Sequence, residues 1–179
     1  AEGNSEDVQR GYHQAASAFI NVLSELSGEL SLLRTPVGQN SVSPEGSIAK
    51  NMWIAANEIA SRQFATPMIA VAGAVADHIL ASVIRGTRLS RAFVNNGGDI
   101  ALYLSPAESF DVGVCSDPVS GAIASTARIT ADTGIGGIAT SGWRGRSHSL
   151  GIADAVTVFA HNAAAADTAA TLIANEIDL

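Results

Sequence analysis

Two oxygen-bearing side chains, Asp167 and Thr171, lie four residues apart near the end of the 179-residue chain. If the alanine-rich segment around them is helical, this spacing places a carboxylate and a hydroxyl one turn apart on the same face. Both are hard oxygen ligands of the kind that Mg²⁺ prefers, and Mg²⁺ commonly takes only one or two protein carboxylates. An alternative is that the Thr171 hydroxyl only donates to the carbonyl of Asp167 within the helix.

A second polar cluster places amide and carboxylate side chains around two glycines. Because glycine has no Cβ, backbone N–H groups there can approach a ligand closely, and a phosphate, a ribose or a metal-bound water would fit. An ordinary hairpin turn has the same composition, with local hydrogen bonds from Asn and Asp and positive φ at Gly. The candidate cofactor-binding residues of this cluster are Asn95, Asn96, Gly97, Gly98 and Asp99.

A third group of candidates lies between residues 139 and 149, a predicted loop rich in hydroxyl and basic side chains. Arg144 and Arg146 could pair with a phosphate, and Trp143 could stack on a flat ring. The alternative is a solvated basic loop whose tryptophan covers the edge of the core. The candidate cofactor-binding residues of this segment are Thr140, Ser141, Gly142, His148 and Ser149.

Well-known catalytic signatures give no further candidates. The sequence contains no G-x-x-x-x-G-K-[ST], H-E-x-x-H or G-x-S-x-G motif and no paired cysteines. The run Gly134-Ile135-Gly136-Gly137 is too short and isolated to be a dinucleotide-binding fingerprint. The candidate residues must therefore be judged by the elements that position them.

The composition restricts the classes of partner. The net charge is -7 and the ten Lys and Arg are spread thinly, so nucleic acid and anionic membranes are poor partners. The longest apolar run, Met68 to Ala76, is about half as long as a bilayer span requires. The lone Cys115 and the polar, acidic start without a signal-like segment predict a cytoplasmic protein. Charged residues make up only 15% of the chain, which is compatible with a homo-oligomer.

Hydrophobic periodicity predicts helices in the first half of the chain. Residues 7–33 carry apolar side chains at spacings of three and four and are predicted to form one amphipathic helix, which Gly28 weakens or ends early. Ser43 is the predicted N-cap of the next helix, with Pro44 at its first position and its end near residue 62. Thr66-Pro67 then marks a break before a thin, alanine-rich helix that Gly86 ends.

From residue 91 the period changes to two. The runs AFVNN and DIALYL are joined by Gly97-Gly98, which predicts a tight hairpin. The runs FDVGVC, AIASTARI, GGIATSG and ADAVTVFA are predicted to complete one antiparallel sheet. Asn162 is the predicted N-cap of a last helix that carries Asp167 and Thr171. The order of helices, strands and a helix predicts a single α+β domain over residues 1–179, an antiparallel sheet packed with helices.

Four short motifs, taken in order, resemble the ApbE family, which comprises magnesium-dependent FAD:protein FMN transferases. They are V-N-N-G-G-D-I at 94–100, A-T-S-G at 139–142, A-V-T-V at 155–158 and A-D-T-A-A-T at 166–171. The similarity covers roughly residues 67–177. The resemblance implies a T-fold-like helix-and-sheet unit that occurs twice, with FAD in the cleft between the two copies.

The resemblance also implies roles for the candidate residues. Asp167 and Thr171 would bind Mg²⁺, completed by a backbone carbonyl between Gly73 and Ala76, and residues 96–99 would border the flavin nucleotide. The reaction of the family transfers FMN from FAD to a threonine hydroxyl of a partner protein and releases AMP. The metal would polarise the pyrophosphate and neutralise charge on the leaving phosphate.

Two family motifs are replaced in this chain. A-G-A-V-A-D at 72–77 stands where the family has G-G-I-A-K-G, and H-S-L-G-I-A-D-A-V at 148–156 stands where it has H-x-x-D-P-x-x-G. The pattern therefore resembles an uncharacterised branch of ApbE-like proteins more than the transferases themselves. The chain is also short for the family, which predicts that N-terminal strands are missing.

We therefore expect a protein that binds a flavin or related nucleotide with Mg²⁺, with flavin or nucleotidyl group transfer as the implied reaction. One alternative is a non-catalytic binding or assembly protein on the same fold, which the lost lysine and histidine motifs favour. Another is an enzyme in which Arg144, Arg146 and His148 meet a different small anionic substrate.

Overall fold

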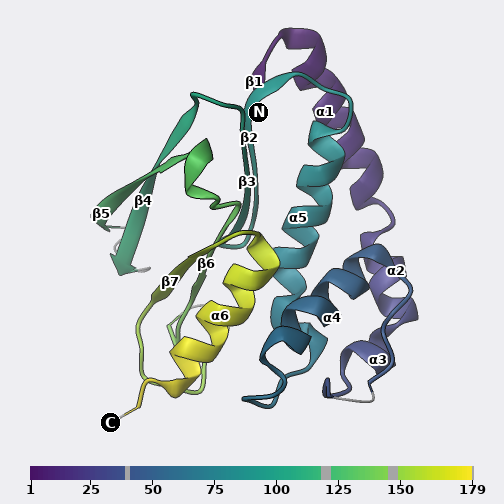
Figure 1. The fold of residues 1–179 in the computed structure, drawn as a ribbon, viewed down its shortest axis with the longest axis vertical. Helices are drawn as coiled ribbons and strands as arrows, with labels where there is room; N and C mark the ends of the chain where they lie inside the picture. The colour runs from purple at the N-terminus through teal and green to yellow at the C-terminus, as the bar shows by residue number, and fades with distance from the viewer. Residues whose placement is uncertain (39–40, 118–121, 145–148, 179) are drawn as a thin grey trace.

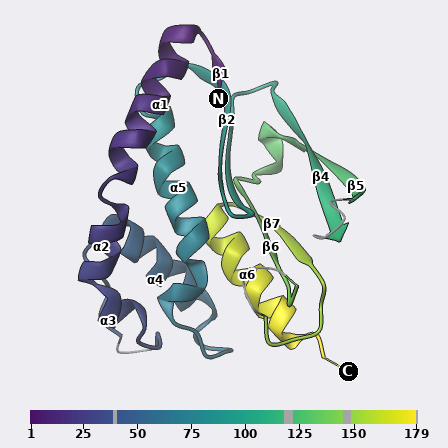
Figure 2. The same ribbon diagram turned by 180° about the vertical axis from the view of Figure 1, so that it is seen from behind.

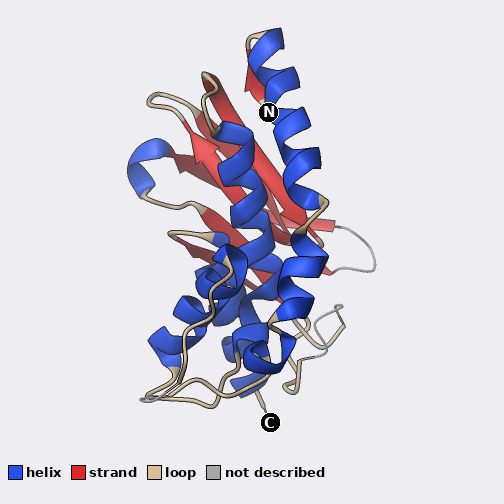
Figure 3. Cartoon of the chain, turned by 90° about the vertical axis from the view of Figure 1, so that its right-hand side faces the viewer, coloured by secondary structure: helices blue, strands red, loops and turns tan. Residues whose placement is uncertain are grey.

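The centre of the fold is a five-stranded antiparallel sheet with the strand order β1-β2-β3-β6-β7. The computed structural model describes residues 1–38, 41–117, 122–144 and 149–178. The strands of the sheet are β1 (Glu2–Gly3), β2 (Leu89–Asn96), β3 (Asp99–Leu104), β6 (Gly137–Ser141) and β7 (Val156–Ala160). With helices packed on this sheet (Figure 3), the predicted α+β class is confirmed.

Helices cover one face of the sheet in two layers (Figure 1, Figure 2). The inner helices are α5 (Val71–Ile84), which packs on β2 and β3, and α6 (Ala163–Glu176), which packs on β6 and β7. The outer helices α1 (Ser5–Phe19) and α4 (Ser47–Ile59) contact α5. The strand pairs β2–β3 and β6–β7 thus each have their own inner helix, which precedes its strands in the first unit and follows them in the second.

One segment in the described part of the chain, Pro67–Ile84, is long and apolar enough to cross a membrane by length and composition alone. It joins the short helix η1 (Pro67–Ala70) to α5, and its mean hydropathy is 1.7 over 18 residues. Within the fold, 56% of it is buried, because α5 lies between the sheet and the other helices. This burial is typical of the core helix of a globular domain.

The prediction of one sheet is wrong, because β4 (Ser109–Asp117) and β5 (Ala122–Thr130) pair only with each other. This hairpin lies on the face of the sheet opposite the helices (Figure 1). There Ile129 of β5 packs with Leu102 of β3 and Ile138 of β6. The hairpin therefore covers the second face of the sheet and adds no strand to its edge.

The prediction of a continuous helix over residues 7–33 is wrong, although a helix does end at Gly28 as expected. The structure has α1, then α2 (Val22–Gly28) and α3 (Leu30–Leu33), with turns around residues 20–21 and 29. These turns allow Val22 and Leu33 to reach the core cluster beside α4, whereas Phe19 and Leu23 stay exposed. Tertiary contacts therefore override the continuous helical period.

The start of α4 also differs from the prediction, because the N-cap is Gly46 and the Ser43 hydroxyl donates to the carbonyl of Pro44. Two carboxylates from α2 and its end accept the N–H groups at this helix start instead. Glu29 accepts from the N–H groups of residues 45 and 46, and Glu25 accepts from that of Ile48. Acidic side chains near a helix N-terminus are favourable, so a neighbouring helix replaces the local serine cap.

Candidate functional site

Helices α5 and α6 cross closely, and each N-terminus receives a carboxylate from the other helix. At the crossing, a Cβ on Gly73 would overlap the carbonyl of Ala163, so only glycine fits there. Asp167 Oδ2 accepts from the Gly73 N–H at 3.0 Å. Asp77 of α5 accepts from the N–H groups of Ala163 and Ala164 at 3.0 and 2.9 Å. This exchange anchors the Asp167 carboxylate in a defined position at the start of α5.

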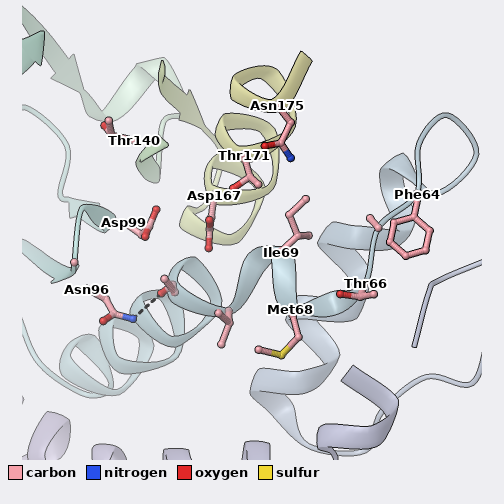
Figure 4. Close-up of a pocket in the computed structure, with 14 residues that line it drawn as sticks. Phe64, Thr66, Met68, Ile69, Asn96, Asp99, Thr140, Asp167, Thr171 and Asn175 are labelled. Carbon is pink, nitrogen blue, oxygen red and sulfur yellow. Dashed lines mark hydrogen bonds between the residues drawn. The ribbon is translucent and has the colours of Figure 1, made fainter. Parts of the chain in front are cut away.

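A pocket of about 620 Å³ opens beside this crossing. Along one face of α6 it is lined by Asp167, Thr171 and Asn175, which are spaced four residues apart. The hairpin between β2 and β3 contributes Asn96, Gly97 and Asp99, and β6 contributes Thr140. Figure 4 shows the side chains of Asp99 and Asp167 close together at one end of the pocket.

The opposite wall of the pocket comes from residues 64–72, which run from the end of α4 into the start of α5. Its larger side chains are mainly apolar: Phe64, Met68 and Ile69, with the hydroxyl of Thr66 among them. The buried Ala65 and Pro67 hold this segment against the rest of the fold. The pocket therefore combines an acidic end with an apolar wall.

The two carboxyl groups have raised pKa values for a shared reason. Burial, and then the nearby charge of Asp167, raise the pKa of Asp99 to about 7. Burial raises the pKa of Asp167 to about 6, against the opposing effect of the N–H groups of Gly73 and Ala72. None of the described residues that line the pocket is Lys, Arg or His. Two neighbouring carboxylates therefore share this pocket without a cationic partner.

This donor set fits a magnesium ion. Asp99 and the Thr171 hydroxyl have no hydrogen-bond partner in the described part of the chain, and both line the pocket with Asp167, whose carboxylate is anchored by the N–H groups of Gly73 and Ala72. The alternative hydrogen bond from the Thr171 hydroxyl to the carbonyl of Asp167 is therefore not formed among the described residues. No group of three or more His, Cys, Asp or Glu that could hold a metal occurs within the described residues. Magnesium needs only one or two carboxylates, because water and phosphate oxygens complete its octahedron.

The predicted cluster at residues 95–99 divides between the two interpretations. Asn95 Oδ1 accepts from the N–H of Gly98, and Gly97 and Gly98 both have positive φ, as a tight turn requires. Asn96, Gly97 and Asp99 line the pocket, and Asn96 Nδ2 donates to the carbonyl of Ala72 (dashed in Figure 4). Asn95 and Gly98 therefore shape the turn, whereas the other three residues face the pocket.

The candidates at residues 140–149 divide similarly. Thr140 lines the pocket, and its hydroxyl lies 2.9 Å from that of Thr157. Ser141 is buried and hydrogen-bonded to Ser149 at 3.1 Å, and Gly142 packs tightly against the backbone of Asp154. Ser141, Gly142 and Ser149 lie at and after the end of β6 and do not line the pocket.

Arg144 and Trp143 are arranged differently from the anion site predicted for residues 139–149. Arg144 pairs with Asp154 at 3.1 Å and lies over the ring of Trp143, whose indole N–H also donates to Asp154. Arg146 and His148 lie outside the described residues. Arg144 is therefore held by a carboxylate and an aromatic ring outside the pocket.

Several pocket residues were missed by sequence reasoning. Asn175 follows Thr171 by four residues, so the helical period that joins Asp167 to Thr171 could have identified it. The residues Phe64, Thr66, Met68 and Ile69 gave no such signal, because their segment reaches the pocket only through the packing of α4 and α5.

Comparisons with known proteins agree with the resemblance at the level of the family. A UPF0280 protein of Methanocaldococcus jannaschii is 33% identical over 183 residues, covering 93% of this chain and 67% of that protein. UPF0280 proteins of Methanococcus vannielii and Methanoculleus marisnigri are 40% and 42% identical over 114 and 112 residues. These alignments cover 61% and 62% of this chain.

The chain spans about half the length of most of these relatives, such as 44% of the Methanococcus vannielii protein and 45% of the Methanoculleus marisnigri protein. The family model described as "AbpE bacteria" matches residues 1–179, the whole sequence. The family model and these relatives point to the same group of proteins. The chain therefore belongs to the AbpE bacteria family, an ApbE-related family with UPF0280 relatives.

Proposed function

We propose that this protein binds a nucleotide, a flavin nucleotide or a related one, together with Mg²⁺ in the pocket between α6, the β2–β3 hairpin and residues 64–72. The observation that carries this proposal is the pair of carboxylates, Asp99 and Asp167, in a pocket whose described lining residues include no cationic side chain. A divalent cation would offset their mutual repulsion, and a phosphate group would then complete the coordination of the metal.

Each residue of the acidic end has a distinct role in this proposal. Asp167 would bind the metal through its carboxylate, which the N–H of Gly73 holds in place by a hydrogen bond to Oδ2. Thr171, one helical turn away, would supply a hydroxyl oxygen, and Asp99 would supply the second carboxylate. Bound magnesium would polarise the phosphoryl oxygens and neutralise charge on them. The residues of the pocket would bind and orient the nucleotide.

The reaction implied by the ApbE resemblance, transfer of FMN from FAD to a protein threonine, is part of this proposal. A second candidate function is nucleotide binding without catalysis, as in a binding or assembly protein. The absence of Lys, Arg and His from the described lining residues favours it, because charge on a leaving phosphate would be neutralised by the metal alone. The replaced lysine of the 72–77 segment agrees with this second candidate.

Thermal melting tests the proposal. The midpoint Tm is measured for the protein with FAD, FMN, ATP or buffer alone, each with and without Mg²⁺, because a ligand selective for the folded state raises Tm. The variant Asp167→Asn keeps the acceptor for the Gly73 N–H and removes the charge. The control for disturbance of the helix crossing is Asp77→Asn on the partner helix outside the pocket, where the amide keeps one of the two hydrogen bonds that Asp77 accepts from the start of α6.

We expect a nucleotide-dependent rise in Tm that requires Mg²⁺ in the unchanged protein and in Asp77→Asn, and that is lost in Asp167→Asn. An equal rise in all three proteins would place the ligand elsewhere. If no nucleotide shifts Tm with Mg²⁺, the proposed function is wrong. A transfer assay with FAD and a threonine-containing protein then separates the catalytic candidate from the non-catalytic one.

A further inference from the structure

The pocket has a charged end and an uncharged end. In Figure 4, Asp99 and Asp167 lie on one side, Phe64 lies on the far side, and Ile69 and Met68 lie between them. Asp99 and Asp167 hold all the formal charge among the described lining residues. A ligand that fills the whole pocket therefore meets carboxylates at one end and apolar or neutral polar groups at the other.

Phe64 at the uncharged end is an aromatic ring without a partner in the core. Its relative exposure is 79%, whereas the next residue, Ala65, is buried at 3%. Ala65 packs in a small cluster around Val37 and Ala56, and Phe64 belongs to no core cluster of the described residues. An exposed aromatic ring at the edge of a pocket is suited to stack on a flat ring of a ligand.

Asn175 lies in the last turn of α6, next to Glu176, whose carboxylate accepts from the side chain of Gln63, the residue before Phe64. The Oδ1 atom of Asn175 accepts from the N–H of Leu150 at 2.9 Å, which assigns the amide orientation and leaves Nδ2 as the remaining donor. Gly151, the next residue, packs tightly against the carbonyl of Ala174, so the backbone that orients Asn175 is itself fixed. The Nδ2 group has no hydrogen-bond partner in the described part of the chain.

The spacing along α6 sets the length of the ligand. Asp167 and Asn175 are eight residues apart in the helix, which corresponds to about 12 Å at 1.5 Å per residue. That length is suited to a molecule with phosphates at one end and a ring at the other. The Thr171 hydroxyl lies between these two positions and faces the middle of such a ligand.

We propose that Phe64 and Asn175 form the base-binding end of the pocket, where a heteroaromatic ring stacks on Phe64 and accepts a hydrogen bond from Asn175 Nδ2. This inference rests on the proposed function, because the phosphates of the same ligand would lie with Mg²⁺ at Asp99 and Asp167. The ligand class is therefore a nucleotide whose ring carries an acceptor, a ring nitrogen or a carbonyl oxygen, on the edge that faces Asn175. The adenine of ADP and the flavin ring of FMN both meet this description.

Isothermal titration calorimetry in the presence of Mg²⁺ tests the inference with three probes: inorganic pyrophosphate, ADP and FMN. Pyrophosphate reports on the acidic end alone, and ADP and FMN distinguish which ring is bound. The variants are Phe64→Ala and Asn175→Asp, which keeps the acceptor for the Leu150 N–H and removes the donor. Phe19→Ala is the matched control, because Phe19 is also exposed, at 63%, but lies on α1 outside the pocket.

We expect Phe64→Ala to weaken binding of ADP or FMN about fivefold or more, as loss of a base-stacking aromatic ring does, and to leave pyrophosphate binding unchanged. Asn175→Asp should weaken the same nucleotide more than it weakens pyrophosphate, and Phe19→Ala should change neither. Equal effects on pyrophosphate and nucleotide, or no effect of Phe64→Ala, would overturn the inference and leave the metal–phosphate proposal standing. If none of the three probes binds the unchanged protein with Mg²⁺, the proposed function itself fails.

Discussion

Replacing Asp99 by asparagine is expected to stabilise the ligand-free protein at about pH 8 and to remove most of its response to Mg²⁺. The folded-state pKa of Asp99 is about 7, well above its ordinary value of 3.8, because the ionised carboxylate is partly buried beside Asp167. Ionised Asp99 therefore destabilises the fold when no cation is bound. Asparagine keeps the shape of the side chain and removes this charge.

The magnitude follows from the pKa. A rise from 3.8 to about 7 corresponds to an upper limit of about 4 kcal/mol in the free energy of unfolding. Asp99 is partly exposed, and water screens its charge, so we expect about 1–2 kcal/mol. For a chain of this length, 1 kcal/mol changes Tm by about 2–4 °C, which predicts a rise of about 2–8 °C.

The pH dependence identifies the cause of this change. The cost of ionised Asp99 is fully present above the folded-state pKa of about 7, decreases as pH falls and disappears below about 3.8, where the group is protonated in both states. Melting curves without Mg²⁺ should therefore show the gain of Asp99→Asn at about pH 8 and little gain at about pH 4. Asp132→Asn is the control, because Asp132 is exposed and its pKa is lowered by the Thr130 hydroxyl.

Two results would refute this reasoning. A lower Tm of Asp99→Asn at high pH would mean that the carboxylate makes a stabilising contact in the free protein. An equal gain at both pH values would mean that the effect comes from packing and not from charge.

Two further predictions follow from the same helix crossing and pocket. The rise in Tm that Mg²⁺ causes in the unchanged protein should shrink as pH falls below about 7, because Asp99 and Asp167, with pKa values of about 7 and about 6, must lose protons to bind the metal. A response independent of pH would exclude these carboxylates as ligands. In a denaturant titration, Gly73→Ala should lower the free energy of unfolding by about 2 kcal/mol or more, because the added Cβ would overlap the carbonyl of Ala163. The control Gly28→Ala, at a position with open space around it, should be neutral or slightly stabilising.

Local elements were largely predictable because short-range preferences and helix or strand periodicity decide them. Gly97-Gly98 forms the expected hairpin turn, with Asn96 paired to Asp99, and the Asn162 side chain caps the last helix at Ala165 N. The period of that helix alone places Asp167 and Thr171 on one face.

Elements whose form depends on distant partners were not predictable. The cap of α4 comes from Glu25 and Glu29 on α2 and its end, which offer a better set of acceptors than the local Ser43. The alternating pattern of β4 and β5 predicts strands correctly but cannot say which strands pair, because either face of the sheet can bury such a pattern.

The sequence by itself determined which residue types could bind a metal or a phosphate, since residue type and helical or turn spacing are local properties. Only the tertiary structure decided which of them meet. The hairpin that carries Asp99 and the helix that carries Asp167 are brought together by packing around α5, and that same packing removes the water that would otherwise keep both carboxyl pKa values low. The apolar wall from Phe64 to Ile69 likewise reaches the site through helix packing, which no periodicity along the chain encodes.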